Sequence, residues 1–473
     1  MCCPPEATET STVSGFSRFS GFSGFSGFCV AIIGALPVPA RLARALTFRD
    51  LVVYGLLFIG PLAPVGVFGV LDARTNGAVA LTYVLATIAM AFTAWSYAEM
   101  SRVVPHAGSV FAYATEGLGH RAGFVAGWMA MLDYLLIPSV AYLFSGIALH
   151  ALIPAVPAWI FTLMAFGLTT TLNLMGVRLA ARAGAAVLVA EIVVLVVFLG
   201  AAALFLRSAG PARPWLSPLF GLSPFEGSAV IGAVSVAVLS YLGFDAIAGF
   251  AEENAGEPRD VGRAIVFCLA AAGLTFVAQT WLGALLAVVS PADLGAHPDR
   301  QGTAFYDITS AAIGPWLGRV LAVTKAIGPA FAAMTGQAAA ARLLFGMARD
   351  GRLPRALAAV DARHGVPRRA LGTAAVLTLV VSIWAARRPD GLDVLVSIVD
   401  VGALSAFTLL HASVAGYFVV ARRGPPRPAH RVVPIVGAAV TVWVIAEASV
   451  LAQLVALVWA AAGFTVYAVQ GRS

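Results

Sequence analysis

The chain has 473 residues, of which 60% are hydrophobic and only 11% are charged, and its mean hydropathy is +0.89. Soluble domains carry about a quarter charged residues, so this composition excludes an ordinary soluble protein and predicts helices that face lipid. The net charge of +7 does not indicate nucleic-acid binding, because nearly all the basic residues are arginines set between apolar runs, as on the cytoplasmic loops of membrane proteins.

Residues 1–48 differ from the remainder of the chain. Residues 14–28 read SGFSRFSGFSGFSGF, a low-complexity repeat without a core-forming period. The apolar run 29–40 is too short to span a bilayer, and acidic rather than basic residues precede it, which does not fit a signal peptide. We predict a disordered tail, or sequence upstream of the true start, for which Val38 is one candidate. The four cysteines have no disulfide or metal spacing, so we expect no metal and no cofactor.

After Arg49 the chain becomes a series of apolar segments. A helix needs about 20 apolar residues to cross about 30 Å of hydrocarbon. By this criterion the sequence predicts an all-α membrane protein with twelve spans, near residues 51–71, 77–98, 121–147, 157–175, 183–206, 227–250, 262–289, 316–344, 368–385, 394–420, 431–447 and 450–469. With the N-terminus inside, arginines on inner segments outnumber those on outer segments by about three to one. We therefore expect both termini to be cytoplasmic and the protein to lie in the cell membrane.

The first predicted span contains an unusual cluster of helix breakers. It reads LVVYGLLFIGPLAPVGVFGV, in which Pro61 and Pro64 lie within ten residues of Gly60, Gly66 and Gly69. Each proline removes an N–H donor and crowds the preceding turn, so the cluster predicts unwinding around Ala63, Pro64, Val65 and Gly66. The alternative is a helix that is only kinked, or that packs closely through its glycines.

The sixth predicted span carries a carboxylate between two glycines. Gly243 and Gly249 flank Asp245 in an otherwise apolar segment. An acid within the membrane usually faces a cavity, although Asp245 could instead cap a half-helix or pair with a neighbour. Breaks in the first and sixth spans predict two inverted five-helix halves, near 51–206 and 227–420, whose broken helices meet around a substrate.

Four stretches resemble the amino acid–polyamine–organocation permeases. They are PHAGSVFAYATEGLG at 105–119, WMAMLDYLLIP at 128–138, SYLGFDAIAGFAEENAGEPRDVGRAI at 240–265 and AARLLFGMARDGRLP at 340–354. The second of these is nearer to the putrescine importers. The resemblance covers roughly residues 50 to 420.

The resemblance implies a leucine-transporter-like fold, with a ten-helix core at 49–420 and two accessory helices at 421–473. It implies transport of amino acids or polyamines, often driven by protons. The family's substrate contacts carry over to the first break at Ala63–Gly66, and in the sixth span to Tyr241, Gly243, Phe244 and Asp245. The chain departs from the family at Pro64-Val65-Gly66, where most members have Gly-x-Gly and the putrescine importers tend to have an acid in place of Gly66.

Other polar residues lie within predicted spans. Asp133 and Tyr134, midway along the third span, could bind a substrate amine or form a structural hydrogen bond. Glu191 in the fifth span could relay a proton. Lys325, the single lysine, is expected to extend toward the outer surface; the sharper alternative is an amine that replaces a coupling sodium ion. Because that ion site should lie nearer Gly336, we include this glycine among the substrate contacts.

The sequence therefore predicts a secondary transporter rather than an enzyme, since no catalytic constellation stands out. We expect an amino acid or a polyamine as substrate, a proton as coupling ion, lipid as surroundings, no nucleic acid, and a monomer or homodimer. An exchanger and a non-transporting receptor are the alternatives. On the cytoplasmic side we expect an ion-pair network that gates access, formed by Glu252, Glu253, Arg259, Asp260 and Arg263.

Overall fold

The computed structural model describes residues 44–106, 108–175, 177–222, 225–361, 366–388 and 391–470, all within one compact unit, Arg41–Ser473. The predicted tail at 1–48 lies almost entirely outside the described residues. In chain order the elements are α2 (Phe48–Ile59), η1 (Ala63–Gly66), α3 (Phe68–Arg74), α4 (Val79–Val103), α5 (Val110–Leu118), α6 (His120–Leu152), α7 (Ala158–Met175), α8 (Val177–Ala209), α9 (Ser217–Phe220), α10 (Gly227–Leu239), η2 (Asp245–Glu253), α11 (Pro258–Leu286), α12 (Pro291–Ala296), α13 (Pro298–Gln301), α14 (Ala304–Ala312), α15 (Pro315–Arg349), η3 (Arg355–Ala358), α16 (Arg368–Ala386), α17 (Gly391–Val414), η4 (Ala415–Val420), α18 (Ala429–Ala446) and α19 (Val450–Gln470).

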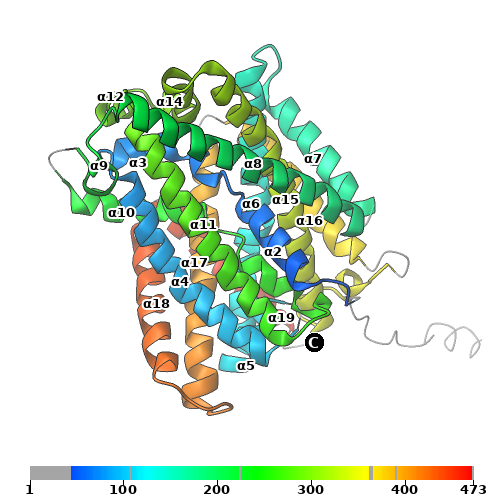
Figure 1. Cartoon of the computed structure of the whole chain (residues 1–473). Coiled ribbons are helices and arrows are strands. Elements are labelled where there is room, and N and C mark those ends of the chain that lie inside the picture. Colours follow the sequence, from blue (N-terminus) through cyan, green and yellow to red (C-terminus); the bar gives the residue numbers. More distant parts are fainter. Residues whose placement is uncertain are drawn as a thin grey trace, which may run out of the picture. The chain divides into compact units, whose positions relative to one another are not determined.

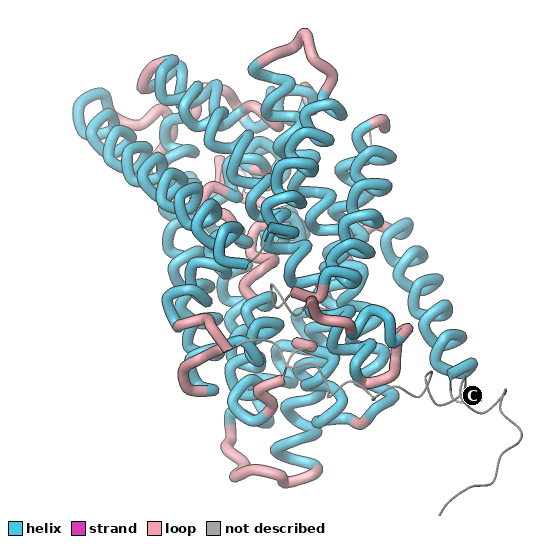
Figure 2. Tube along the Cα trace, turned by 90° about the vertical axis from the view of Figure 1, so that its right-hand side faces the viewer, coloured by secondary structure: helices cyan, strands magenta, loops and turns pink. Residues whose placement is uncertain are grey.

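Helices make up almost all of the described chain, and their connections gather at the two ends of the bundle (Figure 2). Among the described residues there are 11 helices long and apolar enough to cross a membrane, and Gly227–Leu239 is a shorter apolar helix. Eleven of these twelve segments coincide with the predicted spans to within about five residues. The sixth, predicted at 227–250, is helical only to Leu239, because the span is broken there. The prediction of an all-α, multi-span membrane protein is confirmed.

The first span is broken, as predicted. Helix α2 ends at Ile59, and Gly60 adopts a φ of +76°, which favours glycine. Pro61 lacks the N–H that would continue the helix, and residues Ala63–Gly66 form only a 3₁₀ turn before α3 begins. The break thus starts three residues earlier than predicted, because the chain leaves the helical conformation at Gly60 rather than at Ala63.

The sixth span is broken as well. Helix α10 ends at Leu239, and the chain continues through turns to the 3₁₀ helix η2, which begins at Asp245. Gly243 has a φ of +116°, and a Cβ placed on it would lie 2.7 Å from the Phe58 ring of α2. The two breaks are therefore in contact, and a side chain at Gly243 would push them apart.

Packing between helices follows an inverted repeat of two five-helix halves. The first half-helix of the first span, α2, packs on η2, whereas α3 packs on α10, so the two broken spans run antiparallel. Helix α4 packs along its counterpart α11, as Figure 1 shows, and α6 along its counterpart α15. The contacts of α6 with α7 and α17 reappear as contacts of α15 with α16 and α8. Exchanging the halves leaves this pattern unchanged, which is the property of an inverted repeat.

Candidate functional site

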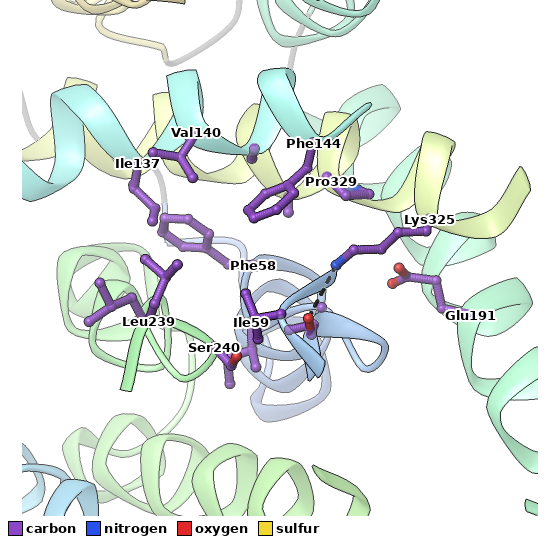
Figure 3. A pocket seen from close by; sticks show the side chains of 16 residues that line it. Phe58, Ile59, Ile137, Val140, Phe144, Glu191, Leu239, Ser240, Lys325 and Pro329 are labelled. Atoms are coloured by element: carbon purple, nitrogen blue, oxygen red, sulfur yellow. Dashed lines mark hydrogen bonds between the residues drawn. The ribbon is translucent and has the colours of Figure 1, made fainter. Parts of the chain in front are cut away.

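A pocket lies at the break of the first span (Figure 3). Its empty volume is ≈ 630 Å³, including space open to solvent. Helices α2, α6, α8, α10 and α15 and the two breaks supply its walls, namely Phe58, Ile59, Gly60, Ala63, Val67, Ile137, Val140, Ala141, Phe144, Glu191, Leu239, Ser240, Leu242, Lys325, Pro329 and Ala332. Most of these side chains are apolar, and the only two charged ones are Lys325 and Glu191.

The Lys325 side chain turns inward from α15 to the break. Its Nζ donates to the carbonyl oxygens of Leu62 and Ala63 at 3.3 and 3.4 Å, and it lies 5.3 Å from the centre of the Phe144 ring. The side chain is only 7% exposed. The prediction that Lys325 extends toward the outer surface is wrong, because carbonyls freed by the break offer its ammonium group partners inside the bundle.

Glu191 faces Lys325 from α8 (Figure 3). Its side chain is buried, and its Oε2 has no hydrogen-bond partner among the described residues. A Cβ on Gly328 of α15 would collide with the Glu191 carboxylate, so the glycine makes room for this acid. Two opposite charges in one apolar pocket stabilise each other, whereas either alone would be costly to bury.

The second break is arranged differently. Asp245 is buried; its Oδ2 accepts a hydrogen bond from the Tyr134 hydroxyl at 2.6 Å, and its Oδ1 accepts from the Gly243 N–H at 3.2 Å. Asp245 thus pairs with a neighbour, which was one of the structural alternatives considered from the sequence. The other alternative, a cap on its half-helix, is not seen, since η2 has no side-chain cap. Neither Asp245 nor Tyr134 lines the described pocket. Their predicted contact with substrate stays a prediction.

Two further buried acids flank this second break. Asp133 of α6 lies within electrostatic range of Asp245 and of Asp400 on α17. Gly402 of α17 packs on α6, since its Cβ position is 3.2 Å from the Asp133 nitrogen. Asp133 and Asp400 each keep one oxygen without a partner among the described residues. The sequence pointed to Asp133 but did not predict that it and Asp400 share one region.

The other predicted contacts lie in the two breaks or pack against α2 beside them. The Tyr241 hydroxyl lies 2.6 Å from Thr87 Oγ1, and Phe244 packs in a cluster of buried aromatic rings. Pro64 and Val65 are buried in the 3₁₀ turn, and a Cβ on Gly336 would lie 2.9 Å from Phe58. Of the predicted site residues, Ala63, Glu191 and Lys325 line the pocket, and Gly66 borders Lys325.

Sequence reasoning missed the aromatic rings of Phe58 and Phe144 that line this pocket. Both lie in largely apolar stretches, where nothing in the sequence distinguishes a pocket-facing phenylalanine from a lipid-facing one.

A buried ion pair lies at the end of each of the two half-helices that follow the breaks, α3 and η2. At the end of α3, Arg213 binds Asp72 through two hydrogen bonds of 2.7 and 2.9 Å and donates to the Ala287 carbonyl. At the end of η2, Glu253 binds Arg342 of α15, with one of the two contacts at 3.1 Å. The N–H groups of Ala45 and Leu46 donate to the Glu253 carbonyl, so the start of the first span is tied to the same place.

The ion-pair partners of the two glutamates in the predicted gating network differ from the prediction. Glu253 pairs with Arg342, and Glu252 pairs with Arg349 at 2.7 Å, both arginines lying on α15 rather than in the loop. Arg263 forms an ion pair with Asp260 at 3.5 Å, and its guanidinium group lies over the Phe48 ring. The loop arginines are near in sequence, but η2 directs both glutamates toward α15.

Two broken, antiparallel helices that meet around a pocket inside an inverted repeat define a membrane transport protein of the multi-span helical class. Comparison with known families agrees: the model of the family described as amino acid permease matches residues 48–469. The chain belongs to this family, as its sequence motifs implied.

Relatives within the family differ in what they transport. The chain is 28% identical over 435 residues to the low-affinity putrescine importer PlaP of Escherichia coli, covering 89% of this chain and 92% of the relative. It is 25% identical to the branched-chain amino acid permease BcaP of Bacillus subtilis, covering 84% and 85%. It is 27% identical to the methylthioribose transporter of the same species, covering 91% and 94%.

Proposed function

We propose that the chain takes up α-amino acids with apolar side chains by alternating access, coupled to protons. The observation that carries this proposal is the charge of the pocket: one buried cation, Lys325, and one buried acid, Glu191, stand at the same end of an otherwise apolar space.

A zwitterion matches this pair of charges. The substrate carboxylate can pair with the Lys325 ammonium, and the substrate ammonium can donate to the carbonyls of Leu62 and Ala63 and to an oxygen of the protonated Glu191 carboxyl. No charge is then left alone in the apolar interior. A diamine would bring two cations next to Lys325, and like charges at short distance in a low dielectric repel strongly.

The remaining walls favour an apolar side chain. Phe58, Ile137, Val140 and Leu239 surround the end of the pocket away from Lys325 (Figure 3). Each methylene group moved there from water contributes about 0.8 kcal/mol. Leucine and isoleucine therefore gain affinity that glycine or a charged amino acid does not.

Proton coupling is proposed to pass through Glu191. A proton on this carboxyl leaves Lys325 as the only charge in the pocket, which favours binding of a carboxylate. Release of that proton restores the Lys325–Glu191 pair and favours release of the substrate. Uptake would then follow the proton gradient.

A second candidate is polyamine uptake. It is favoured by the similarity to the putrescine importer and by the three acids Asp133, Asp245 and Asp400 at the second break. For a diamine to reach them, the Tyr134–Asp245 hydrogen bond would have to open toward the pocket.

The test is uptake of radiolabelled leucine, isoleucine and putrescine into proteoliposomes, with and without an inward proton gradient. We expect gradient-stimulated uptake of the two amino acids and at least tenfold less of putrescine. Putrescine uptake that unlabelled leucine does not inhibit would replace the first candidate by the second. Leucine–leucine exchange without a gradient effect would indicate an exchanger.

We also propose that the protein resides in the plasma membrane with both termini in the cytoplasm, as the distribution of arginines indicates. Labelling of single cysteines placed in the 421–428 loop and in α12 of intact cells tests this. The α12 cysteine is expected to react with a membrane-impermeant reagent, and the loop cysteine is not.

A further inference from the structure

A second pocket, which shares no lining residue with the first, lies at the end of the bundle where α17 turns into α18, the lower end in Figure 1. The end of α4, the start of α11, η4 and the 421–428 loop enclose it, with an empty volume of ≈ 970 Å³ including open solvent. Its lining residues are Glu99, Arg102, Val103, Glu257, Pro258, Arg259, Phe418, Arg423, Gly424, Pro425, Arg427 and His430. Four arginines against two glutamates make it basic.

The two acids already have partners. Glu99 accepts from Arg102 at 3.1 Å and from His430 at 3.1 Å. The Glu257 side chain caps the first turn of α11. Arg259 is exposed and has no ion-pair partner in the described part of the chain. Arg427 is 3.9 Å from the shared Glu99, and Arg423 forms an exposed ion pair with Glu116 at 3.0 Å. Positive charge thus remains available to an anion.

Buried side-chain contacts hold one wall of the pocket in place. His430 is buried, and its ring stacks on Phe418 with centroids 4.0 Å apart. Its Nδ1 accepts from the Arg427 backbone N–H at 3.0 Å, so the other ring nitrogen carries the proton donated to Glu99. These contacts fix the loop that carries Arg423 and Arg427 against the end of α4.

Apolar surface continues from this pocket along the bundle. Helix α4 packs on both α11 and α18, and its own residues Ile88 and Ala91 are exposed. On either side, Phe267 of α11 and Ile435 of α18 are 52% and 69% exposed. A soluble anion would leave this apolar surface uncovered, whereas the acyl chains of a lipid would contact it.

We propose that this pocket binds the phosphate headgroup of an anionic phospholipid, with the acyl chains lying over α4 between α11 and α18. Basic pockets between helices on the cytoplasmic side recognise such headgroups, and arginine forms paired hydrogen bonds with phosphate. The proposal does not depend on the transported substrate. A lipid held here touches α4 and α11, which are equivalent in the two halves, together with the accessory helix α18.

The test uses native mass spectrometry of the purified full chain, titrated with phosphatidylglycerol or phosphatidylcholine. The variant R259Q/R423Q removes two pocket arginines. The control R355Q/R369Q makes the same charge change at exposed arginines outside the pocket. Near an anionic headgroup each arginine contributes about fivefold, so the pocket variant should bind phosphatidylglycerol at least tenfold more weakly. The control should bind it like wild type.

Equal loss in both double variants, or none in either, overturns the proposal. So does wild-type protein that binds inorganic phosphate in an arginine-dependent way but shows no preference for phosphatidylglycerol, because the ligand would then be a soluble anion. If R259Q/R423Q does not fold, as judged by size-exclusion chromatography, the single variant Arg259→Gln decides, with about fivefold weaker binding expected.

Discussion

The breaks in the first and sixth spans occupy equivalent positions in the two halves, yet they differ in charge: a cation and an acid stand at the first, and, among the described residues, only acids at the second. At the first, α15 contributes the Lys325 cation and α8 contributes the acid Glu191. At the second, the equivalent helices α6 and α17 contribute Asp133, Tyr134 and Asp400, so that Asp133 stands within electrostatic range of both Asp245 and Asp400.

The difference shows how one repeated backbone serves two purposes. The first break leaves carbonyls and a charge pair open to a pocket, whereas the second satisfies its carboxylate through Tyr134 and the Gly243 N–H. The first is therefore suited to exchange partners with a substrate. The second is suited to hold the broken helix in shape, and it changes only if the Tyr134 hydrogen bond opens.

The largest effect is expected at the first break. Lys325→Ala leaves Glu191 buried without its counter-charge and removes the partner of the substrate carboxylate. Uptake should fall by more than about 100-fold, and stability by about 3–5 kcal/mol. The double variant K325M/E191Q removes both charges and should recover stability in thermal unfolding without recovering uptake. Recovered uptake would show that the pair is only structural.

The ion pairs beyond the breaks extend the comparison, since α3 ends in Asp72–Arg213 and η2 in Glu253–Arg342. Arg213→Ala and Arg342→Ala each leave a buried carboxylate alone, so each should lower stability by about 3 kcal/mol. Thermal unfolding in detergent measures this, with the exposed pair Arg423–Glu116 as control, where Arg423→Ala should cost less than about 1 kcal/mol. Similar losses at all three positions would contradict the distinction.

At the second break a smaller effect on transport is expected. Asp245→Asn keeps the shape of the side chain but leaves one oxygen instead of two. That oxygen can accept from either Tyr134 or Gly243, and the NH2 group then faces the other donor. We expect about tenfold slower uptake at unchanged expression. Tyr134→Phe should slow uptake by about fivefold, since one hydrogen bond contributes about 1 kcal/mol. Wild-type uptake in Asp245→Asn would remove this residue from the mechanism.

The smallest effect is expected at Gly66. A methyl group there would lie 3.1 Å from Lys325 Cε, so Gly66→Ala should shift the lysine by a few tenths of an ångström. We expect the KM for leucine to rise about twofold to threefold with kcat nearly unchanged. Gly372→Ala is the matched control, because nothing lies within 4 Å of its Cβ position. An effect as large as that of Lys325→Ala would mean that the turn itself binds substrate.

The sequence by itself determined the twelve spans and both breaks. Span length follows from the thickness of hydrocarbon, and the breaks follow from the missing N–H of Pro61 and Pro64 and from the conformational freedom of Gly60 and Gly243. These are local properties, so they can be predicted without knowledge of neighbouring helices.

Only the tertiary structure decided which charges meet. Lys325 lies on α15, a long helix that is buried over much of its surface, so no polar face indicates where its side chain points. Packing against the carbonyls of the first break turned it inward, and the direction of η2 brought Glu252 and Glu253 to Arg349 and Arg342. In a membrane helix that is apolar on all sides, the neighbouring helices set the direction of a polar side chain, and a single sequence does not contain that information.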